Sequence, residues 1–429
     1  MEDFLSSCSG AVKVNLDQAG SGFHVVLGNE ACDVDSMVCA LTYAYFLSKQ
    51  TGCSETLVVP MLNIRQSELP LRSDSVYLLR QVALDPELLL FRDQLDLRDL
   101  HRGGRLRLTL VDHNVLPRSD SDLEGAVVEV IDHHLQERAS SPSCPVTVEV
   151  VGSCATLVTE RILQKAPEVL DQQVAQLLYA AVVLDCVNMA PSAGKVTPKD
   201  EHIAAALESR FPSLPPRDDF FQTLNEAKFN VSGLNTEQML LKDLKAVSGS
   251  LNVAVSVLYV PLEDFLQRAG LEAELSGFCM KFGFDLLLLM TISFSESREP
   301  IRELAVFSHS AACRQQVSHY LEQARDPALN LSPITNPHPR VAAYQQGNSI
   351  ASRKKLLPIV KDFLKEREGG GCLGDGCLGD VEEEDEDSCF PPTPMNSLAE
   401  GCPLDNGLPH ISALDLEEKF SKMAERKGN

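Results

Sequence analysis

Two stretches of the chain decide its fold: residues 106–114 read LRLTLVDHN, and residues 127–134 read VVEVIDHH. Each begins with an apolar run of the length of a buried strand and ends in an Asp-His pair. Similar patterns alternate on either side of them, with strands expected at 24–27, 56–60 and 146–151 and helices at 36–48, 153–164 and 172–184. Strands that alternate with helices are typical of a parallel sheet covered by helices. We therefore predict an α/β fold for the first half of the chain.

A Pro-rich stretch at 211–216 predicts a boundary between two domains, at 1–210 and 211–366. The second domain has a mixed α/β pattern, with helices expected at 236–246 and 311–323 and strands at 251–260, 286–294 and 303–307. Beyond residue 366 the chain reads GGGCLGDGCLGD, followed by an acidic run and a proline cluster. Such a composition cannot bury enough apolar surface to fold. Residues 367–429 are therefore predicted to form a disordered acidic tail.

Composition excludes several classes of protein. A net charge of −23 argues against nucleic-acid binding, which normally uses a basic face. The chain has no apolar run of about 18 residues and no signal-like N-terminus, so we expect no membrane span and no secretion. Its 13 cysteines are scattered and form no CxxC pair, which indicates reduced thiols. We expect a cytoplasmic protein, and the sequence leaves access to the nucleus open.

Acidic and imidazole side chains follow three of the expected strands. Residues 28–36, GNEACDVDS, place Asp33 and Asp35 two residues apart after the first strand, and the two Asp-His pairs follow later strands. The carboxyl ends of parallel strands meet at one edge of a sheet, so these side chains should lie close together. Carboxylate and imidazole groups together suit a divalent ion such as Mn²⁺. A lone histidine at such a place would usually be structural.

A fourth acidic residue, Asp185, ends the helical run 172–184. A carboxylate is unfavourable at that end of a helix, so a neighbouring cation is a reasonable explanation. Two alternatives remain open: Asp185 can be a simple helix boundary, and Asp35 with Ser36 can simply cap the helix that follows them.

The order DxD, DH, DHH and a later Asp resembles the motifs of the DHH phosphoesterase superfamily, which includes family II pyrophosphatases, exopolyphosphatases and prune proteins. The resemblance covers about residues 20–365. Four segments are similar to the exopolyphosphatase and prune group in particular: GNEACDVDS, VGSCATLVTERIL, LDCVNM and SRKKLLP. The resemblance implies a parallel-sheet DHH domain followed by a smaller DHH-associated domain.

The resemblance also implies two metal ions, Mn²⁺ or Mg²⁺. One ion would be held by Asp33 and Asp112, and the other by Asp35, Asp112, His133 and Asp185. Asn29 stands where pyrophosphatases have a histidine, and is a weaker neutral ligand.

Two further residues beside these ligands have implied roles in catalysis. His134 would face the substrate phosphate, and Asp132 would orient its neighbouring imidazole. Asp112, as the bridge between the ions, is the third residue expected to carry the reaction.

Positive charge for a phosphate substrate is expected from the second domain. Ser352-Arg353-Lys354-Lys355 resembles the SRKK signature with which the family grips phosphate, and Lys245 resembles a third contact. Without the resemblance, a basic triplet that opens a surface helix is usually only solvated.

The implied function is metal-dependent hydrolysis of phosphoanhydride bonds in short-chain polyphosphate, by two-metal activation of water. Pyrophosphatase and cyclic-nucleotide phosphodiesterase activities remain open, because the same ions serve any exposed phosphoryl group. A different class also remains open, that of a signalling scaffold whose tail binds protein partners. The prune group is associated with such partners, including nucleoside diphosphate kinase.

Overall fold

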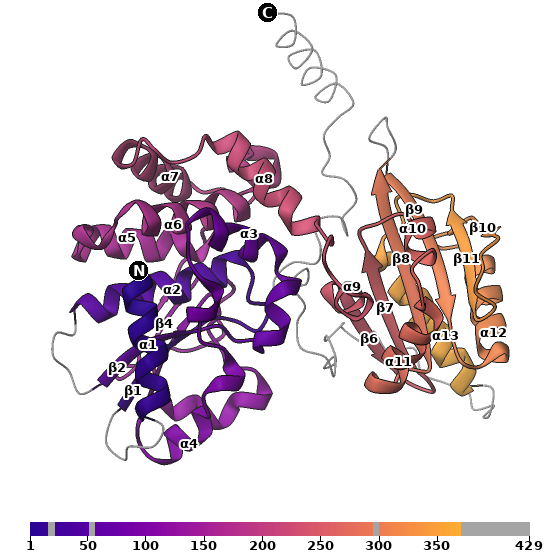
Figure 1. The fold of residues 1–429 in the computed structure, drawn as a ribbon, viewed down its shortest axis with the longest axis horizontal. Coiled ribbons are helices and arrows are strands. Elements are labelled where there is room, and N and C mark those ends of the chain that lie inside the picture. Colours follow the sequence, from indigo (N-terminus) through magenta and orange to yellow (C-terminus); the bar gives the residue numbers. More distant parts are fainter. Residues whose placement is uncertain (16–21, 51–55, 295–299, 370–429) are drawn as a thin grey trace, which may run out of the picture. The chain divides into compact units, whose positions relative to one another are not determined.

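The computed structural model describes residues 1–15, 22–50, 56–294 and 300–369, and within them the chain forms two compact units, Met1–Asn230 and Val231 onward (Figure 1). The division lies about twenty residues after the predicted boundary at 210/211. The reason is helix α8 (Arg217–Phe229), which buries Phe220 and Leu224 in the core of the first unit. The predicted tail, 367–429, lies outside the described residues except for its first three.

The first unit is built on a parallel five-stranded sheet in the order β2-β1-β3-β4-β5. All five strands predicted from the sequence are present: β1 (Gly22–Leu27), β2 (Thr56–Met61), β3 (Leu106–Val111), β4 (Val127–Asp132) and β5 (Val146–Val148). Leu27 lies opposite both Met61 and Leu110, and Val111 lies opposite Ile131. The carboxyl ends of the central strands therefore meet at one edge of the sheet, as the motifs require.

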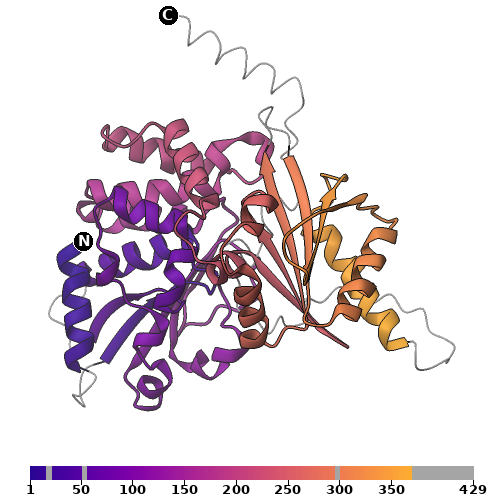
Figure 2. The same ribbon diagram turned by 45° about the vertical axis from the view of Figure 1, so that its right-hand side comes forward.

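Helices cover both faces of this sheet, because successive strand residues point to opposite sides. Val26 packs into one core, together with α2 (Val34–Gln50), α5 (Cys154–Lys165) and α6 (Gln172–Asp185), the three helices predicted from periodicity. Phe23 and Val25 pack into a second core with α1 (Glu2–Asn15) and α4 (Leu97–Arg102) on the other face (Figure 2). The sheet is thus buried on both sides, which explains its continuous apolar strands.

The remaining helices of this unit extend the first core. They are α3 (Ser73–Gln81), α7 (Pro198–Arg210) and α8. Short 3-10 helices connect the larger elements at Gln66–Leu71, Pro86–Leu88, Arg92–Gln94, Arg118–Ala126, Pro167–Val169, Val187–Met189 and Pro191–Ala193.

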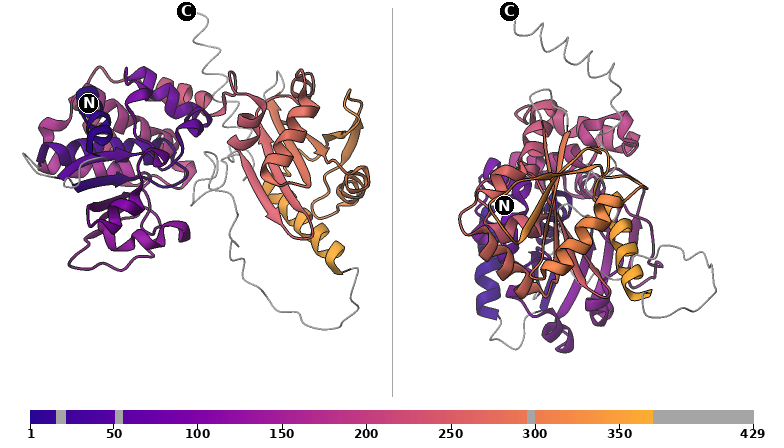
Figure 3. Two further views of the ribbon diagram at one scale, coloured as in Figure 1. Left: turned by 60° about the horizontal axis from the view of Figure 1, so that its bottom comes forward. Right: turned by 90° about the vertical axis from the view of Figure 1, so that its right-hand side faces the viewer.

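The second unit contains a mixed six-stranded sheet in the order β10-β11-β9-β8-β7-β6. Its strands are β6 (Leu244–Ser248), β7 (Asn252–Leu258), β8 (Leu286–Phe294), β9 (Pro300–Phe307), β10 (Leu331–Ile334) and β11 (Val341–Gln346). Strands β7 and β8 are parallel, and the other neighbours are antiparallel. One face carries α12 (Ala311–Gln323) and α13 (Arg353–Gly369), drawn in orange and yellow in Figure 3. The other carries α9 (Thr236–Lys242), α10 (Leu262–Leu266) and α11 (Leu271–Phe282).

One predicted helix of this unit is too long. Residues 236–246 were expected to form a helix, but α9 ends at Lys242 and Leu244–Ser248 forms β6. Leu244 is buried where β6 pairs with β7, so pairing and burial outweigh local helix preference.

Two expectations from composition hold for the described residues. None of their helices is long and apolar enough to cross a bilayer. Their cysteines are buried free thiols, as the scattered spacing predicted.

Candidate metal centre

The loop after β1 is closely packed against the start of α2. Asp33 Oδ1 accepts a hydrogen bond from the Ser36 backbone N–H (3.0 Å), so Asp33 caps the helix that the sequence assigned to Asp35 or Ser36. Gly28 approaches the same turn, because a Cβ atom at Gly28 would lie 2.3 Å from Ser36 Oγ. The loop therefore needs glycine at residue 28. Because Asp33 caps the helix, the Asp35 carboxylate can contact a different element.

Asp35 is held by another helix. The Cys154 and Ala155 backbone N–H groups, at the start of α5, donate to Asp35 Oδ2 (2.6 Å) and Oδ1 (2.8 Å). The Cys39 thiol donates to Oδ1 as well (3.3 Å). Amides at a helix N-terminus attract negative charge, so these contacts favour a carboxylate at this position, which is only 1% exposed.

Asp112 directly follows β3 in a strained backbone conformation. Its φ is 62°, in the left-handed region that residues other than glycine rarely adopt. Asn29 Nδ2 donates to Asp112 Oδ2 (2.9 Å) and to the Asp112 carbonyl (3.1 Å). Asn29 Oδ1 accepts from the Cys32 N–H (3.0 Å). Asn29, predicted as a weak metal ligand, thus contacts the Asp112 carboxylate with its amide nitrogen. Such backbone strain is typical of functional sites.

The two histidines after β4 are oriented by different groups. His133 Nδ1 lies 2.9 Å from the Val151 carbonyl, so Nδ1 carries hydrogen and Nε2 faces the opposite way. His133 Nε2 lies 3.2 Å from Asp112 Oδ1 and 3.9 Å from Asp35 Oδ2. His134 Nδ1 lies 2.7 Å from Asp132 Oδ1. The prediction that Asp132 orients an imidazole therefore agrees with a direct contact to His134.

Asp132 itself is tightly bound. Asn114 Nδ2 donates to Asp132 Oδ2 (2.6 Å), and the His133 backbone N–H donates to Oδ1 (2.8 Å). Burial alone would raise the pKa of Asp132, but its hydrogen bonds from His134, Asn114 and His133 outweigh burial and lower the pKa to about 2. Burial opposes a charge on His134, but Asp132 and Asp112 outweigh it and raise the His134 pKa. Asp132 and His134 therefore stabilise each other's charged forms.

The other carboxylates repel one another. Burial, followed by the charge of Asp35, raises the pKa of Asp112 to about 8 and raises the pKa of Asp33. Asp185, at the end of α6, is affected in the same way by burial and by the charges of Asp35, Asp33 and Asp112, which together raise its pKa well above the usual value. Five of the six predicted ligands thus interact electrostatically: Asp33, Asp35, Asp112, His133 and Asp185.

The donor set fits a divalent cation. Ligand atoms of Asp112, His133 and His134 all lie within 4.8 Å of one another. Asp112 Oδ1 is buried and accepts no hydrogen bond of ordinary geometry, although His133 Nε2 faces it. The surrounding carboxylates, acting against burial, raise the pKa of His133 to about 12, so an ion that binds here would compete with a proton on His133 Nε2. A bound cation would replace this proton and remove the repulsion between the carboxylates.

Several residues that position the site were not predicted from the sequence. They act mainly through backbone groups: the Val151 carbonyl and the Cys154 and Ala155 amides belong to the quoted VGSCATL stretch, and Asn114 completes the quoted DHN. Both stretches were recognised as sequence motifs, but a motif does not reveal which backbone atom contacts which side chain.

The basic residues of the SRKK stretch and Lys245, which were predicted to bind phosphate, lie in the second unit. Arg353 opens α13, as predicted, but its side chain is 0% exposed and pairs with Asp243 Oδ1 (2.7 Å). Asp243 Oδ2 also accepts from the Tyr259 hydroxyl (2.6 Å). Lys354 is exposed and Lys245, on β6, is half-buried. A phosphate contact by Lys354 or Lys245 stays a prediction, and for Arg353 it competes with an internal ion pair.

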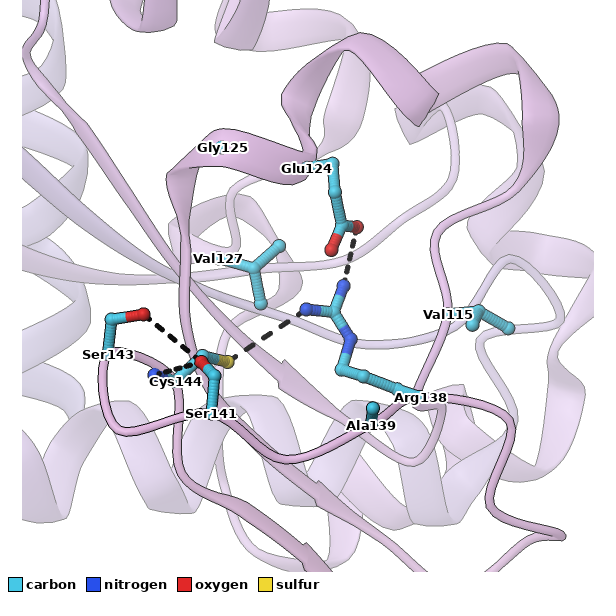
Figure 4. Close-up of a pocket in the computed structure, with 9 residues that line it drawn as sticks. All are labelled: Val115, Glu124, Gly125, Val127, Arg138, Ala139, Ser141, Ser143 and Cys144. Atoms are coloured by element: carbon cyan, nitrogen blue, oxygen red, sulfur yellow. Dashed lines mark hydrogen bonds and ion pairs between the residues drawn. The ribbon is translucent and has the colours of Figure 1, made fainter.

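The first unit also contains a cavity of about 500 Å³ (Figure 4). It is lined by Val115, Glu124, Gly125, Val127, Arg138, Ala139, Ser141, Ser143 and Cys144. None of the predicted ligands lines it, so the cavity is separate from the metal centre. Arg138 connects the two regions, because it pairs with Glu124 in the cavity and donates through Nε to the Asn114 carbonyl (2.8 Å).

Comparisons with known proteins identify families and relatives that are similar to this chain in sequence. The DHH family, N-terminal domain, matches residues 24–182, and the DHHA2 domain matches residues 222–363. Exopolyphosphatase PRUNE1 of Bos taurus is 47% identical over 447 residues and that of Homo sapiens 46%, each covering 99% of this chain and 97% of the relative. A manganese-dependent inorganic pyrophosphatase of Methanocaldococcus jannaschii is 25% identical over 228 residues, covering 51% of this chain and 66% of the pyrophosphatase. The resemblance drawn from the motifs is confirmed, and the chain belongs to the DHH family, in the group of the PRUNE1 exopolyphosphatases.

Proposed function

We propose that this protein is a metal-dependent exopolyphosphatase that hydrolyses phosphoanhydride bonds of short-chain inorganic polyphosphate. The observation that carries this proposal is the contact of His133 Nε2 with Asp112 Oδ1 at 3.2 Å, beside Asp35, without a hydrogen bond of ordinary geometry. Facing ligand atoms of this kind suit a shared cation better than a structural ion pair. The near full-length identity to the PRUNE1 exopolyphosphatases supports the choice of substrate.

The proposed cofactor is a pair of Mn²⁺ or Mg²⁺ ions. Asp33 and Asp112 would hold one, and Asp35, Asp112, His133 and Asp185 the other, with Asn29 beside the first. The mixture of carboxylate and imidazole supports Mn²⁺, as does the manganese dependence named for the M. jannaschii relative. When bound, such ions acidify water and stabilise the oxygens of an in-line displacement at phosphorus.

The protein's own side chains would hold the substrate. Asp132 holds His134 through Nδ1, which leaves Nε2 to face a phosphate oxygen, and the raised pKa of His134 favours the form of the ring that donates from Nε2. Lys354 and Lys245 would add positive charge from the second unit. Arg353 would also contact the phosphate, while its guanidinium stays paired with the Asp243 carboxylate. Catalysis would thus rest on Asp112, His134 and Asp132.

The proposal extends to protein partners and to the cellular compartment. The acidic segment 367–429, which lies mostly outside the described residues, is proposed to bind protein partners such as nucleoside diphosphate kinases. Buried free thiols fit a reducing compartment, so we propose the cytoplasm, without excluding the nucleus.

The proposal is tested by assaying the full chain with pyrophosphate, tri- and tetraphosphate, long polyphosphate and cyclic AMP, each with Mg²⁺ or Mn²⁺. We expect the highest kcat/KM with tri- or tetraphosphate, and loss of all hydrolysis in Asp112→Ala. Faster cleavage of pyrophosphate or cyclic AMP would instead support one of the two other hydrolase activities. A folded wild type that cleaves none of these substrates would favour the scaffold.

A further inference from the structure

Asp200 lies at the start of α7, where its sequence context suggests only a helix cap. Asp200 Oδ2 accepts from the Thr197 N–H (2.8 Å) and hydroxyl (2.7 Å), and the Thr197 hydroxyl lies 3.4 Å from the Asp200 N–H, which is a capping box. A cap of this kind normally lies at the surface. Asp200, however, is 0% exposed, although burying a carboxylate is costly unless it is fully hydrogen-bonded.

Two more hydrogen bonds reach Asp200 from another part of the chain. The Gly152 N–H donates to Asp200 Oδ2 (2.9 Å), and the Thr156 hydroxyl donates to Oδ1 (2.6 Å). Asp200 therefore holds the segment 152–156 at both ends. This segment joins the region after β5 to the first turn of α5.

The segment held by Asp200 contacts two predicted metal ligands through its backbone. The Val151 carbonyl, next to Gly152, fixes the His133 ring through Nδ1 (2.9 Å). The Cys154 and Ala155 N–H groups fix both oxygens of Asp35. Displacement of this segment would move His133 and Asp35 together.

The end of α6 lies against the same segment. A Cβ atom at Gly152 would be 2.4 Å from Cys186 Sγ and 3.2 Å from Asp200 Oδ2. Cys186 directly follows Asp185, the last predicted ligand. No side chain fits between Asp200 and the end of α6, so a shift at Gly152 would also be transmitted towards Asp185.

We infer that Asp200 is a positioning residue for the metal centre, holding residues 151–156 so that His133 and Asp35 face a shared cation. This inference rests on the proposed metal site. Groups that hold ligands in this indirect way typically change metal affinity about 10- to 100-fold when removed.

The test is the variant Asp200→Asn in the full chain, with Mn²⁺ affinity measured by titration calorimetry. We expect the dissociation constant for Mn²⁺ to rise about 10- to 100-fold. Asp171→Ala is the matched control, because Asp171 caps α6 through the Val174 N–H (2.8 Å) and, among the described residues, forms no hydrogen bond with residues 151–156. It should lower the melting temperature and leave Mn²⁺ affinity unchanged. Wild-type affinity in Asp200→Asn would overturn the inference.

A second measurement does not depend on metal. Hydrogen exchange of the Cys154 and Ala155 amides in the metal-free protein should accelerate in Asp200→Asn, and exchange at the wild-type rate would overturn the inference. If the wild type binds no Mn²⁺, the proposed function fails while this exchange measurement still decides the role of Asp200. If Asp200→Asn does not fold, Thr156→Val removes one of the bonds, and both measurements should change in the same direction.

Discussion

His133 Nε2 lies 3.2 Å from Asp112 Oδ1, yet the two atoms form no hydrogen bond of ordinary geometry. Their ring and carboxylate are fixed independently, by the Val151 carbonyl and by Asn29. The fold therefore holds the two atoms in contact. Because ionisable side chains surround this contact, the free energy of unfolding should depend on pH and on bound cations.

The free energy of unfolding of the metal-free protein should decrease as the pH rises from about 4 to about 8. The pKa of Asp112 is raised to about 8 in the folded state, so between its unfolded value and 8 the folded state binds the extra proton. Raised pKa values of Asp33 and Asp185 act in the same direction. Denaturant titrations at several pH values check this, and saturating Mn²⁺ should abolish the decrease. An increase over this range without metal would contradict the account.

Asp185→Asn should separate stability from metal binding. The substitution removes a buried carboxylate that three neighbouring charges repel, so the metal-free melting temperature should rise by about 2–4 °C, equivalent to roughly 1 kcal/mol. The increase in melting temperature caused by Mn²⁺ should shrink in the same variant. Differential scanning calorimetry with and without Mn²⁺ measures both. A lower metal-free melting temperature together with an undiminished Mn²⁺ effect would show that Asp185 is structural.

Asn114→Leu should impair His134 without removing a metal ligand. Asn114 donates to Asp132 Oδ2 and to the Leu135 carbonyl, and its Oδ1 accepts from the Glu137 N–H (2.9 Å). Its loss leaves buried groups unpaired, at a cost of about 1–3 kcal/mol. We expect kcat for triphosphate to fall about tenfold or more while Mn²⁺ affinity changes little. A variant with full kcat would show that the Asp132–His134 pair needs no such support.

Gly28→Ala and Gly10→Ala form a matched pair of substitutions. A Cβ atom at Gly28 would lie 2.3 Å from Ser36 Oγ and 3.1 Å from the Ser36 carbonyl, whereas one at Gly10 meets nothing within 4 Å. Gly28→Ala should destabilise the protein by about 1–3 kcal/mol and weaken Mn²⁺ binding. Gly10→Ala, inside α1, should stabilise it by roughly 0.5–1 kcal/mol. Equal effects of the two substitutions on Mn²⁺ binding would contradict the packing described for the loop after β1.

The parallel sheet was predictable because its strands are buried on both faces. Leu106–Val111 therefore appears in the sequence as a mostly apolar run, interrupted by Arg107 and Thr109, with Asp112 directly after it, and the structure confirms these bounds. Strands β10 and β11 were not predicted: Leu331–Ile334 contains Pro333, and Val341–Gln346 ends in two glutamines. Their pairing comes from long-range contacts that local pattern does not encode.

The proximity of Asp112 and His133 was predictable for a similar reason, since strand ends bring both residues to one edge of the sheet. The groups that orient them were not. The carboxylate of Asp200 acts on Gly152 across 48 residues of chain, and the Cys154 and Ala155 amides act on Asp35 across about 120. Every residue except proline carries the same backbone N–H group. The spacing of residue types therefore does not reveal which carboxylate a given N–H contacts.

The central claim is that Asp35, Asp112, His133 and Asp185 share a divalent cation. A crystal structure of the protein grown with Mn²⁺ tests it most directly, through the anomalous signal of manganese. The account predicts an anomalous peak about 2 Å from Asp112 Oδ1 and His133 Nε2. Well-ordered side chains without any manganese peak between them would contradict it.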